Sequence, residues 1–209
     1  MKALIVVDVQ YDFLPVSEKD FKTGQGGALA VKEGDKIIPI INKLLPKFDL
    51  IIFTMDWHPP RMEAFASSHE GKNSFDTYIV KGKEDTLWPD HCVKNTRGAQ
   101  IHEDINLDLI NGKFYIFKKG LLPNHHPYSG FDGTGLAFFL QSKEVDEIYV
   151  CGLATDFCAA ETAMDGIKNN FKTSLILDAC KPINPNISNL LKKLKKLNIN
   201  VIKSQELLY

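Results

Sequence analysis

Short runs of apolar residues recur along the chain, and most of them are separated by polar segments in which apolar residues have helical spacing. The first run, residues 3–7, is continuous and rich in β-branched side chains, which is typical of a parallel strand buried on both faces. Comparable runs continue to the C-terminal end. The expected strands cover residues 3–7, 49–55, 114–117, 147–150, 174–177 and 200–202.

Apolar residues three or four positions apart predict helices between these strands. They mark an amphipathic helix over residues 33–47, although Pro39 disfavours helix in its first turn. Strands that alternate with helices predict one α/β domain, residues 1–209. It is a three-layer α/β/α, Rossmann-like fold whose central, mostly parallel sheet has six strands. The other expected helices lie at residues 101–110, 136–141, 159–169 and 190–197.

Two stretches show no regular pattern. Residues 15–27 form a polar, glycine-containing loop, and residues 59–96 are rich in Gly, Pro, Ser and Asp. A loop as long as the second one is usually functional or disordered in a compact domain. Trp88 and His91 near its end favour a function, because aromatic and histidine side chains are unusual in a linker.

Chemically active side chains follow four of the expected strands. Asp8 follows the first strand, Asp56 and His58 follow the second, Lys119 follows the third, and Cys158 lies just past the fourth. Ligands of parallel α/β sheets bind beyond the carboxyl ends of the strands. The pattern therefore predicts that these residues meet in one site.

Asp56 and His58 indicate a metal site. They are two residues apart on an extended segment, so their side chains point the same way. With one more imidazole they form a two-histidine, one-carboxylate site with open positions, which suits catalytic zinc, or iron or manganese. We expect His91 as the third ligand. Spacing alone leaves four rivals, and also a hydrogen-bonded loop cluster without metal; the rivals are His69, His102, His125 and His126.

Cys158 is expected where a strand ends and a helix begins, a position that favours the thiolate. A lone cysteine is more often a small buried apolar side chain. Asp8 could equally cap a strand end, and Lys119 could be an exposed turn lysine. Together, however, a thiol, a carboxylate that exchanges protons and a cation beside a Lewis-acid metal predict acyl transfer from an amide.

The composition narrows the class of protein. The net charge of −1 over 209 residues is not that of a nucleic-acid-binding protein and gives no reason to expect membrane attraction. The lysines within residues 192–196 fit a solvated helix face. Four cysteines without paired spacing or a secretion signal indicate free thiols and a reducing compartment, so we expect a cytoplasmic protein.

Six groups of motif residues are spread over nearly the whole chain. They are Asp8-Val9-Gln10 with Asp12-Phe13, Asp56-Trp57-His58-Pro59, Leu87-Trp88-Pro89 with His91-Cys92-Val93, Lys119-Gly120, Tyr128-Ser129-Gly130-Phe131 and Gly152-Leu153-Ala154-Thr155-Asp156 with Cys158. With these motifs the sequence resembles the metal-dependent nicotinamidases of the isochorismatase-like cysteine hydrolase family. The Asp, Lys and Cys motifs are shared across that superfamily, whereas the Asp-Trp-His and Trp-Pro-x-His-Cys motifs are much more specific to the nicotinamidases.

The resemblance implies hydrolysis of nicotinamide to nicotinate and ammonia in NAD salvage, with pyrazinamide as a second substrate. Cys158 would attack the carboxamide and form a thioester, while Asp8 carries the proton and Lys119 supports both. Backbone N–H groups of Ala154 and Cys158 would hold the oxyanion, with a cis peptide before Ala154. One divalent metal ion, foremost zinc, would orient the ring. The implied metal ligands are Asp56, His58 and His91, and the implied pocket walls are Phe13, Trp88, Tyr128 and Phe157.

Some features depart from the family pattern or leave alternatives open. Phe157 stands where relatives often have Tyr, and Lys118 adjoins Lys119. The loop after His58 could supply a fourth metal ligand. One rival function is a different amidohydrolase of the superfamily, without metal. Another is a redox sensor that uses the thiol of Cys158. A homo-oligomer is compatible with the sequence.

Overall fold

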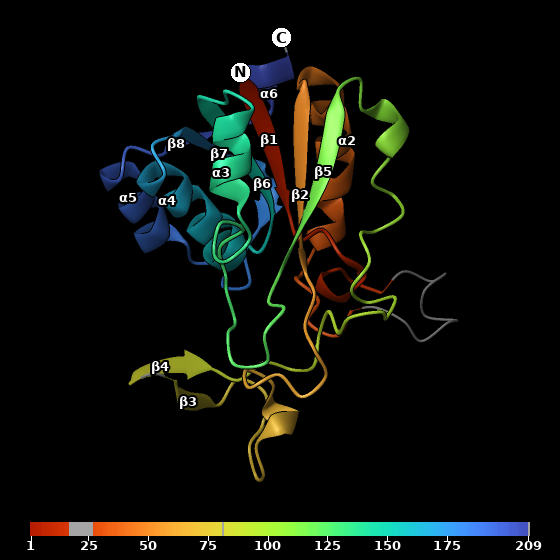
Figure 1. The fold of residues 1–209 in the computed structure, drawn as a ribbon, viewed down its shortest axis with the longest axis vertical. Helices are drawn as coiled ribbons and strands as arrows, with labels where there is room; N and C mark the ends of the chain where they lie inside the picture. The colour runs from red at the N-terminus through yellow and green to blue at the C-terminus, as the bar shows by residue number, and fades with distance from the viewer. Residues whose placement is uncertain (17–26, 81, 209) are drawn as a thin grey trace.

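The computed structural model of the chain describes residues 1–16, 27–80 and 82–208, and a parallel sheet of six strands forms its centre (Figure 1). The strand order is β5-β2-β1-β6-β7-β8, and every neighbouring pair is parallel. The predicted fold class is therefore confirmed. The strands are β1 (Lys2–Val7), β2 (Leu50–Asp56), β5 (Lys113–Lys119), β6 (Glu147–Leu153), β7 (Lys172–Lys181) and β8 (Asn200–Ile202).

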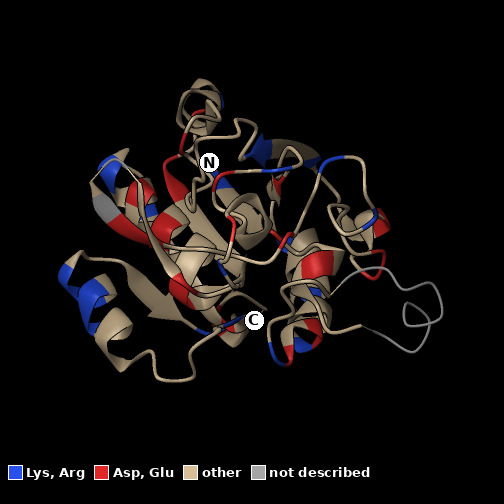
Figure 2. Cartoon of the chain, turned by 90° about the horizontal axis from the view of Figure 1, so that it is seen from below, with Lys and Arg blue, Asp and Glu red and all other residues tan. Residues whose placement is uncertain are grey.

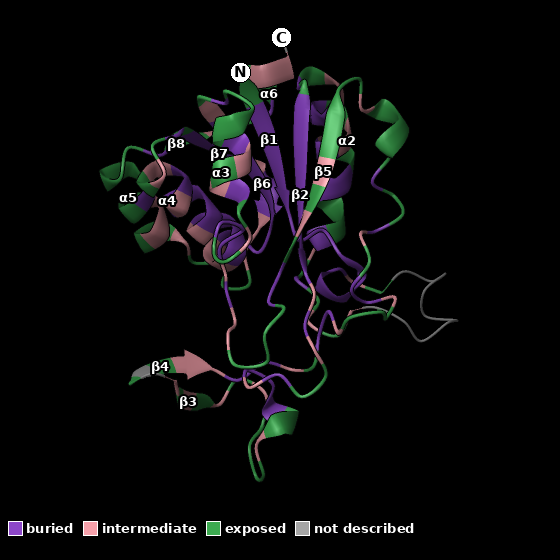
Figure 3. Ribbon diagram, in the orientation of Figure 1, coloured by how far each residue is buried: buried purple, intermediate pink, exposed green. Residues whose placement is uncertain are grey.

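The central strands are buried on both faces, as their apolar sequences require. Every residue of β2 is buried, and so is every residue of β1 after Lys2 (Figure 3). Burial of each large aliphatic side chain contributes about 1.5–3 kcal/mol to folding. The middle of the sheet is thus a firm support for the residues that follow the carboxyl ends of these strands.

Helices cover both faces of the sheet. On one face lie α2 (Ile38–Leu44) and α6 (Gln205–Leu208), and on the other lie α3 (Leu136–Ser142) and α4 (Ala160–Lys168) (Figure 1). A fifth helix, α5 (Ser188–Lys196), packs beside β8. This is the three-layer arrangement that alternating strands and helices predict.

The helix expected over residues 33–47 is divided into three parts. Only α2 is α-helical; the 3₁₀ turns η2 (Gly34–Ile37) and η3 (Leu45–Lys47) precede and follow it. Pro39 and Pro46 each stand in the first turn of their segment. Proline is tolerated there because the N–H groups of a first turn have no partner within the helix.

The helix expected over residues 101–110 is wrong. That segment contains only the 3₁₀ turn η5 (Leu107–Leu109). The side chain of Asn106 accepts a hydrogen bond from the backbone N–H of Asp108 and so starts the turn. Local bonds of this kind compete with the α-helix. Two further short turns are η1 (Tyr11–Phe13) and η4 (Ala66–Ser68).

The irregular stretch after His58 contains a hairpin that the sequence pattern did not indicate. Its strands, β3 (Thr77–Val80) and β4 (Lys83–Thr86), pair antiparallel and lie below the main sheet in Figure 1. The signal was a short β-branched and aromatic run that ends two residues before Gly82, whose φ is +77°. Most of the predicted loop at residues 15–27 lies outside the described residues.

Acidic and basic residues are interspersed over the described chain (Figure 2). The lysines of α5 are exposed, in line with a solvated helix face. None of the helices that the structure describes has the length and apolar character needed to cross a membrane.

Candidate active site

Four chemically active side chains meet beyond the carboxyl ends of the central strands, as the sequence predicts. Asp8 directly follows β1, Asp56 and Lys119 are the last residues of β2 and β5, and Cys158 follows β6. Asp56 and Lys119 are also direct partners in the parallel register. All four are buried.

The ammonium group of Lys119 lies at the centre of this group. Its Nζ atom is 2.5 Å from Asp56 Oδ1, 3.0 Å from Asp8 Oδ2 and 3.5 Å from Cys158 Sγ. It also donates to the carbonyl oxygen of Pro127 at 3.3 Å. The acceptor atoms of Asp8, Asp56 and Cys158 lie within 4.8 Å of one another, and the lysine supplies the cation that balances them.

Burial and charge set the protonation of these groups. Burial raises the pKa of Asp8 above its ordinary value, although Lys119 and a 2.7 Å hydrogen bond from Thr54 oppose the shift. Burial alone would lower the pKa of Lys119, but the carboxylates of Asp56 and Asp8 outweigh it and hold that pKa well above the usual range. Lys119 therefore stays charged while Asp8 can gain and lose a proton.

The prediction that Cys158 favours the thiolate is wrong for the resting site. Burial raises the pKa of its thiol well above the ordinary value, and the nearby cation of Lys119 only partly offsets this. Cys158 lies in a wide helical turn, η6 (Thr155–Ala159), and the regular helix α4 begins only at Ala160. The thiol thus needs a base to take its proton.

The neighbouring lysine is placed differently. Lys118 is exposed, and its Nζ atom lies 3.6 Å above the ring of Trp57. Successive residues of a strand point to opposite faces, so only one of the two lysines can enter the site. The structure places Lys119 there.

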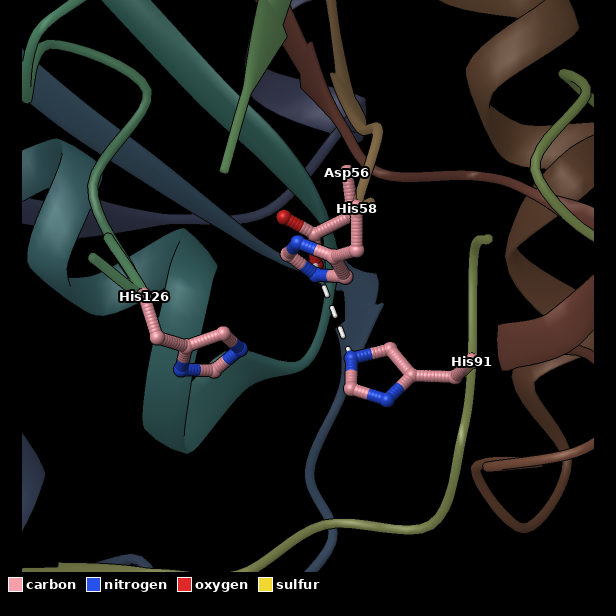
Figure 4. Close-up of side chains that lie close together, drawn as sticks. All are labelled: Asp56, His58, His91 and His126. Carbon is pink, nitrogen blue, oxygen red and sulfur yellow. Dashed lines mark ion pairs between the residues drawn. The ribbon is translucent and has the colours of Figure 1, made fainter. Parts of the chain in front are cut away.

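A second cluster adjoins the first on the far side of Asp56. Asp56, His58, His91 and His126 bring their ligand atoms within 4.8 Å of one another (Figure 4). Asp56 Oδ2 is 3.5 Å from Nε2 of His58 and 3.9 Å from Nε2 of His91. The Asp56 carboxylate thus directs one oxygen to Lys119 and the other to the histidines.

The hydrogen bonds of two histidines fit a divalent cation. Nδ1 of His58 faces the carbonyl oxygen of Gly120 at 3.2 Å, and Nδ1 of His91 faces that of Pro89 at 2.7 Å. With Nδ1 as the donor, Nε2 of each ring is left as a ligand atom, the usual arrangement around a bound metal. His58 Nε2 is buried without a hydrogen-bond partner among the described residues. Burial also lowers the pKa of His91 to about 4, which keeps that ring neutral.

Gly120 allows the close approach of His58 to the strand end. Its φ is +70°, and a Cβ atom added there would lie 2.3 Å from the His58 ring. A side chain at this position would displace the ring, so the Lys119-Gly120 pair serves both clusters.

Of the four other histidines, three lie outside the metal-ligand cluster and one belongs to it. Nε2 of His69 lies 2.6 Å from the carbonyl oxygen of Glu63, His125 pairs with Asp132 at 3.1 Å, and His102 packs on Tyr11. His126 joins the cluster from the loop that follows β5. From the sequence a fourth metal ligand was possible, but it was expected in the loop after His58.

Two side chains to which the sequence assigned no role hold the ligands in place. Gln10 forms two hydrogen bonds of 2.8 Å with the backbone N–H and carbonyl oxygen of Asp56. Asp12 accepts a hydrogen bond of 2.7 Å from the backbone N–H of Cys92, next to His91. Gln10 and Asp12 belong to the motif residues Asp8-Val9-Gln10 and Asp12-Phe13, although neither has a role predicted from the sequence.

A small pocket opens onto both clusters, with Cys158 of the first and Asp56, His91 and His126 of the second in its lining. All four aromatic residues expected as its walls line it, and Trp88 meets Phe157 edge-on with ring centroids 5.2 Å apart. The Trp88 indole donates to the Tyr128 hydroxyl at 3.2 Å, which in turn donates to Asp85 at 2.9 Å. Leu29 and Ile183, which the sequence did not indicate, also line the pocket, as does His126.

Ala154 lines the same pocket beside Cys158. The peptide bond between Leu153 and Ala154 is cis, as the resemblance implies. The remaining cysteines, Cys92, Cys151 and Cys180, are free and buried.

Comparison with known proteins identifies the family of this site. A model of the isochorismatase domain matches residues 2–206. The chain belongs to the isochorismatase family. This membership confirms the resemblance seen in the sequence, and the fold agrees with it.

Individual members of the isochorismatase family are closely similar to the chain. A nicotinamidase of Acinetobacter baylyi is 43% identical over 190 residues, which cover 88% of this chain and 83% of the relative. The structure of an Acinetobacter baumanii nicotinamidase matches with a TM-score of 0.88 and 37% identity, over 99% of this chain and 97% of that one.

A third similar protein was solved with a metal. The structure of Pyrococcus horikoshii pyrazinamidase in complex with zinc has a TM-score of 0.76 and 37% identity, and it covers 97% of this chain and 98% of that one. Together with the cluster around Asp56, it indicates a divalent metal ion in this member of the isochorismatase family.

Proposed function

We propose that the protein is a nicotinamidase, an amidohydrolase that converts nicotinamide to nicotinate and ammonia in NAD salvage, and that it also hydrolyses pyrazinamide. One observation carries the proposal: the buried thiol of Cys158, which contacts Lys119 and through it Asp8, lines an aromatic pocket together with members of a metal-ligand cluster. Relatives named nicotinamidase that are similar over most of the chain support it.

Cys158 is the nucleophile of the proposed reaction. Its thiol proton passes to Asp8 as Sγ attacks the carboxamide carbon, and the backbone N–H groups of Ala154 and Cys158 hold the oxyanion. Asp8 then gives the proton to the leaving nitrogen, so ammonia departs and a thioester remains. Water attacks the thioester with Asp8 as base, and the proton returns to Cys158 as nicotinate leaves.

Lys119 keeps this cycle electrostatically balanced. Its charge stabilises the ionised form of Asp8 before the attack and the sulfur of Cys158 during the proton transfer. Its own pKa is held high by two carboxylates, so it stabilises charge and does not donate a proton itself.

The proposed metal ligands are Asp56, His58 and His91, and the proposed ion is zinc, with iron or manganese as alternatives. Two neutral imidazoles and a carboxylate suit a catalytic zinc ion with an open position. A metal held by these residues would supply a Lewis acid toward the pyridine nitrogen and so would orient the ring. Gln10 fixes the backbone of Asp56, so the ligand carboxylate and the catalytic lysine keep one relative position.

The ring of the substrate fits between Phe13, Trp88, Tyr128 and Phe157. Phe157 provides an aromatic wall without the hydroxyl group that a tyrosine would add. The substrate is thus a small planar amide. We also propose that residues 1–209 form one domain and that the protein works in the cytoplasm, where its four buried cysteines remain free thiols.

Ammonia release from three amides tests the proposal. Nicotinamide and pyrazinamide should be hydrolysed, whereas benzamide, which lacks the ring nitrogen, should be a poor substrate. Equal turnover of benzamide would favour a different amidohydrolase of the same superfamily. No turnover of nicotinamide with any divalent metal would contradict the proposed function.

A further inference from the structure

The imidazole of His126 shares the space enclosed by the other three candidate ligands. Its ring centroid is 5.2 Å from that of His58 and 6.0 Å from that of His91. Figure 4 shows the three rings and the Asp56 carboxylate arranged around a common space: Asp56 and His58 come from the end of β2, whereas His91 and His126 come from two other loops. His126 therefore has the position of a ligand, although it lies far from the others in sequence.

The ring nitrogens of His126 have no partner in the described protein. Both are buried, and neither makes a hydrogen bond with any described residue. A buried polar group left unsatisfied costs about 1–3 kcal/mol. His58 and His91, in contrast, each direct Nδ1 to a backbone carbonyl. A bound cation would give one of the two His126 nitrogens a partner.

The loop that carries His126 is fixed on both sides of this residue. The carbonyl oxygen of Pro123 accepts a 2.7 Å hydrogen bond from the backbone N–H of Glu63, and that of Pro127 accepts one from Lys119 at 3.3 Å. The loop thus holds the imidazole near the metal position, while the ring itself has no such anchor. His126 is accordingly the candidate ligand whose ring orientation is least fixed by the protein.

We propose that His126 is a fourth protein ligand of the divalent metal, which then has three imidazoles and one carboxylate. The inference rests on the proposed metal site and extends it with a residue from the loop after β5. Its consequence is tighter metal binding than Asp56, His58 and His91 give alone, because each added ligand contributes to the affinity.

His125 provides a matched control. It precedes His126 directly, is half-buried, and pairs with Asp132 through Nε2 at 3.1 Å. It does not belong to the ligand cluster. Replacing His125 removes the same side chain from the same loop without touching the proposed site.

The test is a metal titration of the full chain, freed of metal beforehand, with Co²⁺ or Zn²⁺ against a coloured competing chelator. The wild type and His125→Ala should bind one ion per chain with equal affinity. His126→Ala should bind the ion at least about 10-fold more weakly. The loss of a residue that only hydrogen-bonds to a metal ligand already lowers metal affinity about 10-fold, and the loss of a ligand should lower it at least as much. The visible spectrum of the Co²⁺ form should change in His126→Ala and remain unchanged in His125→Ala.

A conservative variant keeps the test valid if the alanine variant folds poorly. His126→Glu offers a carboxylate oxygen from the same position and should recover part of the lost affinity. Far-ultraviolet circular dichroism of the metal-free variants checks the fold. Wild-type affinity and an unchanged Co²⁺ spectrum in a folded His126→Ala would overturn the fourth ligand alone and leave the function standing. A wild type that binds no ion would overturn both.

Discussion

Lys119 donates a 2.5 Å hydrogen bond to Asp56, its direct partner in the parallel register of β5 and β2. The same carboxylate directs its other oxygen to His58 and His91. A single residue at the end of one strand therefore belongs to the catalytic group and to the metal cluster at once. A substitution in either cluster should therefore also affect the other cluster, because Asp56 contacts both.

Lys119→Met should strongly reduce turnover. The substitution removes the cation from between Asp8 and Asp56, and kcat/KM should fall about 10²-fold or more. Stability should fall by about 3–5 kcal/mol, because buried carboxylates lose their partner. Denaturant unfolding and steady-state kinetics measure both effects. Lys118→Met is the control: its ammonium lies outside the site, so activity should change little. A larger loss of activity in the Lys118 variant would reverse the assignment.

The acid side of the pH–rate profile should report Asp8. Only the ionised carboxylate can accept the thiol proton, so kcat/KM falls as the pH drops through the pKa of Asp8, which burial raises above its ordinary value. The hydrogen bond from Thr54 favours the ionised form. Thr54→Val should therefore raise that pKa further and move the acid limb to higher pH. Thr54→Ser keeps the hydroxyl and should leave the limb in place; a Thr54→Val limb that stays put or moves to lower pH would exclude Asp8 as the base.

Cys158→Ala should abolish amide hydrolysis, with a loss of about 10⁴-fold or more, because Cys158 supplies the only thiol among the described residues that line the pocket. Cys180→Ala, at a buried cysteine of β7, is the control and should keep most of the activity. Mass spectrometry of rapidly quenched turnover should find an acyl adduct at Cys158 in the control and none in Cys158→Ala. Turnover by Cys158→Ala would rule out the nucleophile.

His91→Ala should lower both metal content and activity. The substitution removes one imidazole from the cluster of candidate metal ligands. His69→Ala is the matched comparison, since His69 belongs to the same long stretch but bonds to the carbonyl oxygen of Glu63. Metal analysis after dialysis should show substoichiometric metal in the first variant and wild-type content in the second. Unchanged metal and full activity in His91→Ala would remove it from the ligand set.

The convergence of Asp8, Asp56, Lys119 and Cys158 could be predicted because strand patterns are local. A run of apolar β-branched residues marks a strand and its end, and the rule for parallel sheets brings those ends together. The strand pattern did not separate Lys119 from Lys118; that choice rested on the family resemblance, through the glycine that follows Lys119. The exposed position of Lys118 on Trp57 supplies the physical reason.

The histidines could not be resolved in this way. His69, His91, His125 and His126 lie in loops without periodicity, and the path of such loops depends on contacts with distant residues. Asp12, for example, holds the backbone of Cys92 and so places His91. The positions of the pocket residues Leu29 and Ile183 likewise depend on tertiary contacts. Asp156, for example, accepts a hydrogen bond of 2.9 Å from the backbone N–H of Ile183. The protonation of Cys158 also escaped prediction, since it depends on burial.

Ammonia release from nicotinamide by the purified protein, before and after chelation and with metal added back, tests the central claim most directly. Activity should be lost on chelation and restored by a divalent metal, foremost zinc. Cys158→Ala, loaded with the same metal, should stay inactive. Full activity of the chelated protein, with no metal found by elemental analysis, would contradict the joint role of thiol and metal.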